Sequence, residues 1–136
     1  MSAITVPLDG EQRLRVVAEF SAYPPGEQLL ARLVVVNRVR LHEALGARIG
    51  DLDLSAGRLT LPAKRGKRRV VRLHTADVEL AERAIRGRLA GEPLFVGHRG
   101  QSLHPERFRQ SILAAARRAG VPATLTVVRP GALILA

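Results

Sequence analysis

Near the start of the chain, apolar residues recur at the spacing of an amphipathic helix. Asp9 can cap such a helix, and Leu14, Val17 and Phe20 fall on one of its faces as it extends to about Ser21. The segment AYPPG that follows holds two prolines and a glycine, which stop a helix. The pattern therefore predicts a first helix packed through these three side chains.

Three later stretches show helical patterns with end signals. A helix from Glu27 contains the run LLARLVVV, which is short enough for a buried core helix. Another is capped by Thr75 and closed by Gly91, and a last one starts at Pro105 and ends at Gly120. The packed side of the helix after Thr75 is expected to hold Val78, Leu80, Ala81, Ala84, Ile85 and Leu89.

Two short stretches alternate apolar and polar residues in the manner of strands. They are GRLTL at 57–61 and RVVRL at 69–73, and the loop PAKRGK between them contains Gly66. This arrangement predicts a β-hairpin. Together the patterns predict an α+β domain, mainly helical with a small antiparallel sheet, that occupies residues 1–136 as a single unit.

Composition narrows the possible partners. The formal net charge of +10 in 136 residues favours a polyanion, foremost double-stranded DNA, although a basic protein from an arginine-rich proteome is the plain alternative. The chain has no cysteine, no signal peptide and no apolar run long enough to span a membrane, so we expect a cytoplasmic, nucleoid-associated protein without membrane contact. The four histidines lack metal-ligand spacing, and we expect neither a metal nor another cofactor.

The loop and second strand of the hairpin concentrate positive charge. Six cationic residues fall within nine positions, and repulsion among them is costly without an anion nearby. A solvated turn, or a basic edge that discourages strand pairing, is the structural alternative. The hairpin is our main candidate for contact with a phosphate backbone, through Lys64, Arg65, Lys67, Arg68, Arg69 and Arg72.

Three blocks of the sequence resemble one known family. RVRLHEALGARIGDLDL is similar, without a gap, to the GLRxSELxxLxxxDID segment of the tyrosine recombinases and phage integrases. In this alignment Arg40 lies at the first catalytic arginine, Glu43 at the helix glutamate and Asp51 at the aspartate. AKRGKRRVVRL is similar to GKGxKxRxVPL and puts Lys64 at the catalytic lysine. PLFVGHRGQSLHPERFRQSILAAARRAGV resembles the family's LFxxxxGxxLxxxxFxxxxxxxAxxAGI, so the resemblance covers nearly the whole chain.

The resemblance implies a tyrosine recombinase catalytic-domain fold and a chemistry of strand breakage and rejoining. In that chemistry Arg40 and Arg129 would hold the oxygens of the scissile phosphate, and Lys64 would donate a proton to the leaving oxygen. A tyrosine attacks phosphorus in this family, and histidines assist proton transfer. The resemblance also places Arg107, Arg109 and Gln110 near the start of a helix that approaches the major groove, where we expect contacts with base edges.

The sequence departs from the family where its HxxR box should lie. TLTVVRPG resembles TPHDLRHT, but Thr126 replaces the first histidine and Pro130 the second, while Arg129 is kept. The sequence ends at Ala136, before the region that carries the nucleophilic tyrosine in the family, and it lacks the N-terminal domain of full recombinases. Tyr23 lies between two predicted helices, where we expect a half-buried ring rather than a nucleophile.

Three functions stay open on the sequence alone. The first is a DNA-binding protein derived from a recombinase, without catalysis of its own, such as a remnant of a mobile element. The second is part of an active recombinase whose tyrosine comes from another chain or was lost by truncation; the apolar tail GALILA could then dock on a second copy or on a full-length recombinase. The third is an interaction module that no longer binds DNA.

Overall fold

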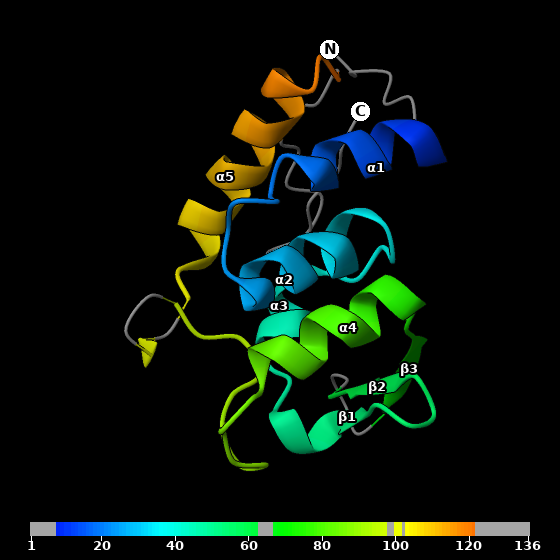
Figure 1. The fold of residues 1–136 in the computed structure, drawn as a ribbon, viewed down its shortest axis with the longest axis vertical. Coiled ribbons are helices and arrows are strands. Elements are labelled where there is room, and N and C mark those ends of the chain that lie inside the picture. The colour runs from blue at the N-terminus through cyan, green and yellow to red at the C-terminus, as the bar shows by residue number, and fades with distance from the viewer. Residues whose placement is uncertain (1–7, 63–66, 98–99, 102, 122–136) are drawn as a thin grey trace.

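The computed structural model describes residues 8–62, 67–97, 100–101 and 103–121. Five α-helices and a three-stranded antiparallel sheet are assigned in these ranges (Figure 1). In chain order the elements are α1 (Gly10–Ala18), α2 (Pro25–Val35), α3 (Leu41–Leu45), the 3-10 turn η1 (Ile49–Asp51), β1 (Leu52–Asp53), β2 (Arg58–Leu61), β3 (Arg69–Arg72), α4 (Thr75–Ala84) and α5 (Pro105–Arg118). The predicted mainly helical α+β class is confirmed.

Helix α2 is the centre of the core. It packs against α1, α3 and α4, while α5 closes over α1 on the side away from the sheet (Figure 1). Because α2 has neighbours on several sides, its buried residues run almost around the helix, as expected of a core helix. They are Leu29, Leu30, Ala31, Leu33, Val34 and Val35.

The first helix confirms its predicted start, and of the three side chains predicted to face the core, Phe20 is buried, Val17 is partly buried against the core and the prediction for Leu14 is wrong. Asp9 caps α1 by accepting the backbone N–H of Gln12 at 2.7 Å. The side chains turned to the core are Val16 and Phe20, both fully buried, whereas Leu14 is 53% exposed. The core lies against α2 and α5, so the buried stripe is rotated away from the predicted one.

The hairpin lies where it was predicted, with strands one residue shorter at one end each. Leu59 faces Val71 and Leu61 faces Arg69 across the antiparallel pair. Leu59 and Leu61 are fully buried, so alternate residues of β2 face the helices. The short strand β1, which pairs with β2, was not predicted.

Helix α4 is shorter than predicted and has a different cap. His74, not Thr75, is its N-cap residue, and the helix ends at Ala84. Gly87 has a φ of +76°, a left-handed conformation that terminates helices, and Leu89 beyond it is 74% exposed. The predicted packing of Leu89 is therefore wrong.

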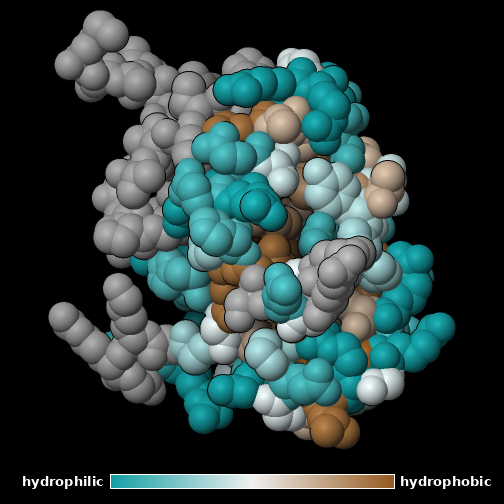
Figure 2. All heavy atoms as spheres, turned by 90° about the vertical axis from the view of Figure 1, so that its left-hand side faces the viewer, coloured by the Kyte–Doolittle hydropathy of each residue, from teal (hydrophilic) through white to brown (hydrophobic). Residues whose placement is uncertain are grey.

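Helix α5 begins at Pro105 as predicted, and it forms one wall of the domain. His104 is its N-cap, and Phe108, Ile112, Leu113, Ala115 and Ala116 are buried. The side of the molecule that carries α5 is mostly hydrophilic, with apolar atoms visible in its middle (Figure 2). Within the ranges that the structure describes, no helix is long and apolar enough to cross a membrane.

Candidate nucleic-acid interface

The N-terminus of α3 and the start of β3 meet at one carboxylate. Glu43 accepts the backbone N–H of Arg40 at 3.3 Å and the Nη1–H of Arg69 at 3.1 Å through the same oxygen, Oε1. The side chain of Glu43 is 14% exposed and that of Arg69 is 46% exposed. This shared acceptor joins residues far apart in sequence and places the backbone at the start of α3 beside the first residue of β3.

The segment before α3 has an unusual backbone. Arg38 is the one non-glycine residue of the described ranges with a positive φ, +56°. Left-handed backbone suits glycine, and in the sequence alignment above Arg38 stands where the recombinase motif has its glycine. The next residue, Val39, is buried and donates its N–H to Leu33 at 2.8 Å. The sharp turn thus returns the chain to the core immediately before Arg40.

A buried carboxylate fixes this turn from the other side. Asp77, in the first turn of α4, is fully buried and pairs with Arg32 at 2.5 Å. It also accepts from Nδ2 of Asn37 at 3.0 Å and from the backbone N–H of His74 at 2.8 Å. Asn37 directly precedes Arg38. The network therefore ties α2, the start of α4 and the turn into α3 to one charged group.

Burial and hydrogen bonding act on Asp77 in opposite directions. Burial alone raises the pKa of its carboxyl, because it penalises the charged form. The hydrogen bonds donated by Arg32, Asn37 and the His74 backbone outweigh burial and leave the pKa of Asp77 below its usual value. Asp77 is therefore ionised at neutral pH and holds Arg32 as a charged partner.

The second strand of the hairpin displays its cations. Lys67, Arg68, Arg69 and Arg72 are all exposed. Arg72 lies directly opposite Arg58 of β2, which sequence reasoning did not single out. Like charges opposite each other in a sheet repel, and the nearest compensation is Asp53 of β1, 3.9 Å from Arg58. Since Leu61, which pairs with Arg69, faces the helices, the strand register places Arg58 and Arg72 on the opposite face of the sheet from Arg69.

The pKa of Asp53 is also lowered. The hydrogen bond from Ser55 is the largest cause, followed by that from the backbone of Ala56, and the charge of Arg58 adds to them. An ionised Asp53 therefore offsets part of the charge of Arg58. The cations of β3 itself, apart from Arg69, have no such acidic partner within the described residues.

Several residues expected at the site cannot be placed beside these groups. Lys64, Arg65 and Arg129 lie outside the described residues, as do Thr126 and Pro130. Of the three residues to which the resemblance gives a phosphate-handling role, the structure places Arg40. Its side chain is half-buried at the start of α3, and the exposed His42 follows two positions later.

The three residues of α5 that were predicted to contact base edges differ in whether their side chains are bound by another residue. Glu106 accepts from Nη1 of Arg109 at 3.1 Å and from Nε2 of Gln110 at 3.3 Å, and the Arg109 side chain is only 13% exposed. The hydrogen bond from Gln110 is the largest cause of the lowered pKa of Glu106, and the hydrogen bond from Arg109 is the next. Glu106 is therefore ionised at neutral pH and holds Arg109 and Gln110 together as a charged clamp. Arg107 is exposed, and no acidic partner contacts it among the described residues.

The tyrosine of the chain is part of the core. The ring of Tyr23 lies 4.7 Å from that of Phe20, centroid to centroid, and Phe20 in turn lies 5.8 Å from Phe108. Tyr23 is half-buried between α1 and α2, as the sequence predicted. It serves packing among the helices.

The comparisons with known proteins agree with the fold and with the alignment of motifs. A family model described as "Phage integrase family" matches residues 8–130, so the chain belongs to the phage integrase family. Its fold is that of the tyrosine recombinase catalytic domain. No curated protein sequence matches the chain significantly.

Several solved recombinases share this fold. The chain is similar to XerA recombinase with a TM-score of 0.74 and 19% identity, over 91% of this chain and 47% of that one. It is similar to XerH site-specific recombinase bound to difH substrate with a TM-score of 0.73 and 20% identity, over 90% and 39%. A lambda integrase tetramer bound to a Holliday junction gives 0.65 and 19%, over 89% and 38%. The chain thus spans less than half the length of these three proteins.

Proposed function

We propose that this domain binds the backbone of double-stranded DNA where β3 meets the N-terminus of α3, and that it does not cleave a strand by itself. The contact of Glu43 with the backbone of Arg40 and the side chain of Arg69 is the observation that carries the proposal, because it places the start of α3 beside the start of the cationic strand. A DNA partner would place the protein at the nucleoid, in the cytoplasm.

The distribution of charge supports a phosphate partner. Lys67, Arg68 and Arg72 are exposed without a carboxylate contact in the described part of the chain. Each phosphate neutralised by such a cation releases condensed counterions, which favours binding at low salt. A domain of the phage integrase family, with relatives whose structures were solved on DNA, would use this surface for the same class of ligand.

The proposed contacts fall into three groups. Arg40, Lys64 and Arg129 would hold a phosphate in the manner of the family. Backbone contacts would come from Arg65, Lys67, Arg68, Arg69 and Arg72. At α5 we assign base-edge contact first to Arg107, since Arg109 and Gln110 must leave Glu106 before they can reach a groove.

The absence of cleavage is inferred from side-chain chemistry. Thr126 and Pro130 stand where the family has histidines, and neither side chain can replace a histidine as a general acid or base near neutral pH. The ring of Tyr23 is committed to Phe20. The domain would therefore hold a phosphate and leave it intact.

A second candidate function is that of one subunit in an active recombinase assembly. Lambda integrase has been solved as a dimer on a core site and as a tetramer on a Holliday junction, so assembly on DNA occurs in proteins of this fold. Arg40 is retained here at the family's phosphate-binding position. In this case a nucleophilic tyrosine would come from another chain.

Fluorescence anisotropy with a labelled duplex tests the first candidate. Replacing Lys67 and Arg68 by Glu should weaken binding at low salt by at least roughly tenfold and reduce the slope of log affinity against log salt by about 2. Arg86→Glu makes the same kind of change on an exposed arginine beyond the far end of α4 from β3, and it should have little effect. Equal losses in both variants, or no salt-dependent binding at all, would contradict the proposal.

A suicide duplex that traps covalent adducts separates the two candidates. The protein alone should form none. An adduct that appears only when an active recombinase is added, and that depends on Arg40 of this chain, would establish the second candidate instead.

A further inference from the structure

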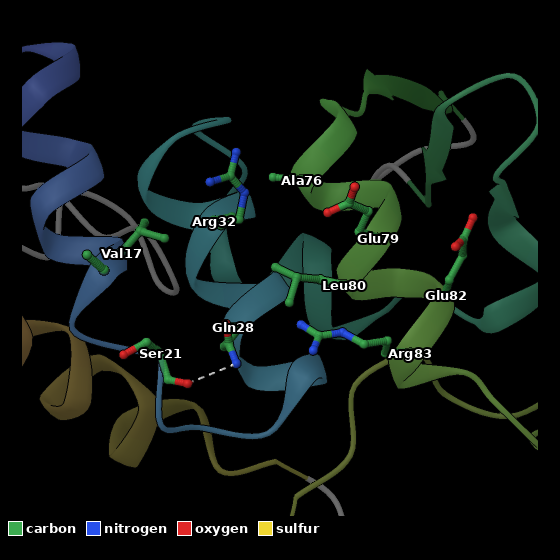
Figure 3. Close-up of a pocket in the computed structure, with 10 residues that line it drawn as sticks. Val17, Ser21, Gln28, Arg32, Ala76, Glu79, Leu80, Glu82 and Arg83 are labelled. Atoms are coloured by element: carbon green, nitrogen blue, oxygen red, sulfur yellow. Dashed lines mark hydrogen bonds between the residues drawn. The ribbon is translucent and has the colours of Figure 1, made fainter.

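A groove of about 650 Å³ lies between α1, α2 and α4, away from the cations of β3. Figure 3 shows Leu80 of α4 and Gln28 of α2 in its middle, with Val17 on the α1 side. The groove is open to solvent rather than an enclosed pocket, so it offers a surface on which another surface could pack. The groove is therefore a surface without an occupant in the chain that the structure describes.

Helix α1 presents an apolar stripe beside this groove. Leu14, Val17 and Ala18 are spaced so that they share one side of α1, and Val17 and Ala18 line the groove together with Ser21, which follows the end of the helix. Val16 lies on the opposite side and is fully buried, while Val17 also packs in part against the core. Leu14 continues the stripe by one turn and is 53% exposed, so it adds apolar surface beside the groove.

Several charged side chains at the groove have no ion-pair partner within the described residues. In this arginine-rich chain most carboxylates bind a cation or cap a backbone N–H. Glu79 and Glu82, which line the groove, have neither kind of partner among the described residues. The carboxylate of Glu79 and the guanidinium of Arg83 extend on either side of Leu80 (Figure 3). Arg15, next to Leu14, is exposed and likewise has no acidic partner in the described ranges.

We propose that the groove receives α1 of a second copy of this chain. The stripe and the groove adjoin on one molecule, so a two-fold axis brings the stripe of each copy to the groove of the other, as in isologous dimers. Leu14 of each copy then packs on Leu80 and Val17 of the other, and Arg15 meets Glu79 and Glu82. Carboxylates and arginines are nearly balanced here, which makes it a face where two strongly basic chains can approach without repulsion.

The dimer is independent of the proposed DNA surface. It uses none of the cations of β3 and leaves Arg40 and Arg107 accessible. Two DNA-binding surfaces would then be carried by one particle, so the apparent DNA affinity would gain from bivalency wherever both can engage one duplex.

Sedimentation equilibrium of the full chain, without DNA, tests the contact. The wild type should show a monomer–dimer equilibrium, and Leu14→Asp should weaken it by at least about tenfold because each dimer loses two buried leucines. Leu89→Asp is the matched control, since Leu89 is an exposed leucine outside the groove. A wild-type chain that stays monomeric at every concentration, or a Leu14→Asp chain that associates like the wild type, overturns the proposal and leaves the groove to another occupant.

A charge exchange tests the geometry. Arg15→Glu, and separately the double change Glu79→Arg with Glu82→Arg, should each weaken the homodimer because both symmetry-related contacts become repulsive. Mixed together, the two variants should form a heterodimer at least about tenfold tighter than either homodimer, since opposite charges then meet at both contacts. No gain on mixing contradicts this pairing of α1 with the groove.

Discussion

Two acidic residues in first turns of helices bind the same kinds of partner in different surroundings. Asp77 of α4 and Glu106 of α5 each hold one arginine and one side-chain amide. The partners of Asp77 are Arg32 and Asn37, which lie 45 and 40 residues away, and the carboxylate is fully buried. This clamp therefore joins separate parts of the fold.

The clamp at Glu106 is local and open to water. Its partners, Arg109 and Gln110, lie three and four residues further along the same helix, and the Glu106 side chain is 54% exposed. A charged contact in water is worth little, because solvent competes for both partners. The same set of partners, a carboxylate with an arginine and an amide, therefore has two different roles. Asp77 fixes the turn that leads to Arg40, whereas Glu106 binds Arg109 only weakly, so that a stronger anion can displace it.

The largest effect is expected from breaking the buried clamp. Asp77→Ala leaves the charge of Arg32, the amide of Asn37 and the N–H of His74 without their acceptor. Removal of one partner from a buried ion pair costs about 3–5 kcal/mol, and urea denaturation should show a loss of that order. Thr75→Ala changes an exposed side chain in the first turn of the same helix, outside the groove, and should change stability by less than about 0.5 kcal/mol.

The pH dependence of unfolding identifies the source of that loss. Because the pKa of Asp77 is lowered in the folded state, its contribution is present above the unfolded value of about 3.9 and is lost as the pH falls through the folded value. Asp77→Ala should therefore lose less stability than the wild type on acidification below about pH 4. Parallel acid limbs in the two proteins would show that the effect of the substitution is not electrostatic.

An intermediate effect is expected at the turn that Asp77 holds. Arg38→Gly replaces a left-handed arginine by the residue that suits this conformation, and it should stabilise the domain by about 0.5–1 kcal/mol. Arg38→Ala removes the same side chain and keeps the unfavourable φ, so it isolates the backbone contribution. If both variants have the same urea midpoint, the turn carries no strain that glycine relieves.

The smallest effect is expected at the exposed clamp. Glu106→Gln should change stability by no more than about 0.5 kcal/mol. Because it frees Arg109 and removes a negative charge from the start of α5, binding to duplex DNA should tighten a few-fold in the anisotropy assay. Weaker binding would instead mean that Glu106 holds Arg109 in the position that contacts DNA.

Those parts of the fold that depend on local chemistry could be predicted from the sequence. The Asp9 cap, the proline at the start of α5 and the alternation in β2 and β3 each act over a few residues. The predicted face of α1 was wrong at Leu14, because Val16 and Leu14 are both apolar and only the positions of α2 and α5 decide which of them is buried. The prediction made α4 too long, and a local signal in the sequence could have corrected it, since Gly87 comes before the exposed Leu89.

The candidate site likewise has parts that the sequence could predict and parts that depend on tertiary contacts. Motif alignment pointed to Arg40 and the hairpin, but the link through Glu43 joins residues 26 apart, and no periodicity reveals it. Pairing of Arg58 with Arg72 likewise needed the strand register. The hold of Glu106 on Arg109 and Gln110, by contrast, follows helical spacing and could have been predicted from the sequence.

The closure of α5 over α1 has a consequence for biosynthesis. Arg118 binds Glu19 at 3.0 Å across 99 residues, and Phe108 lies against Phe20 in the same contact. A ribosome delivers residues in order, so α1 is completed early, and its inner face waits for α5 until nearly the whole domain has emerged. Such long-range closure slows folding, and the nascent chain keeps Phe20 uncovered during that interval.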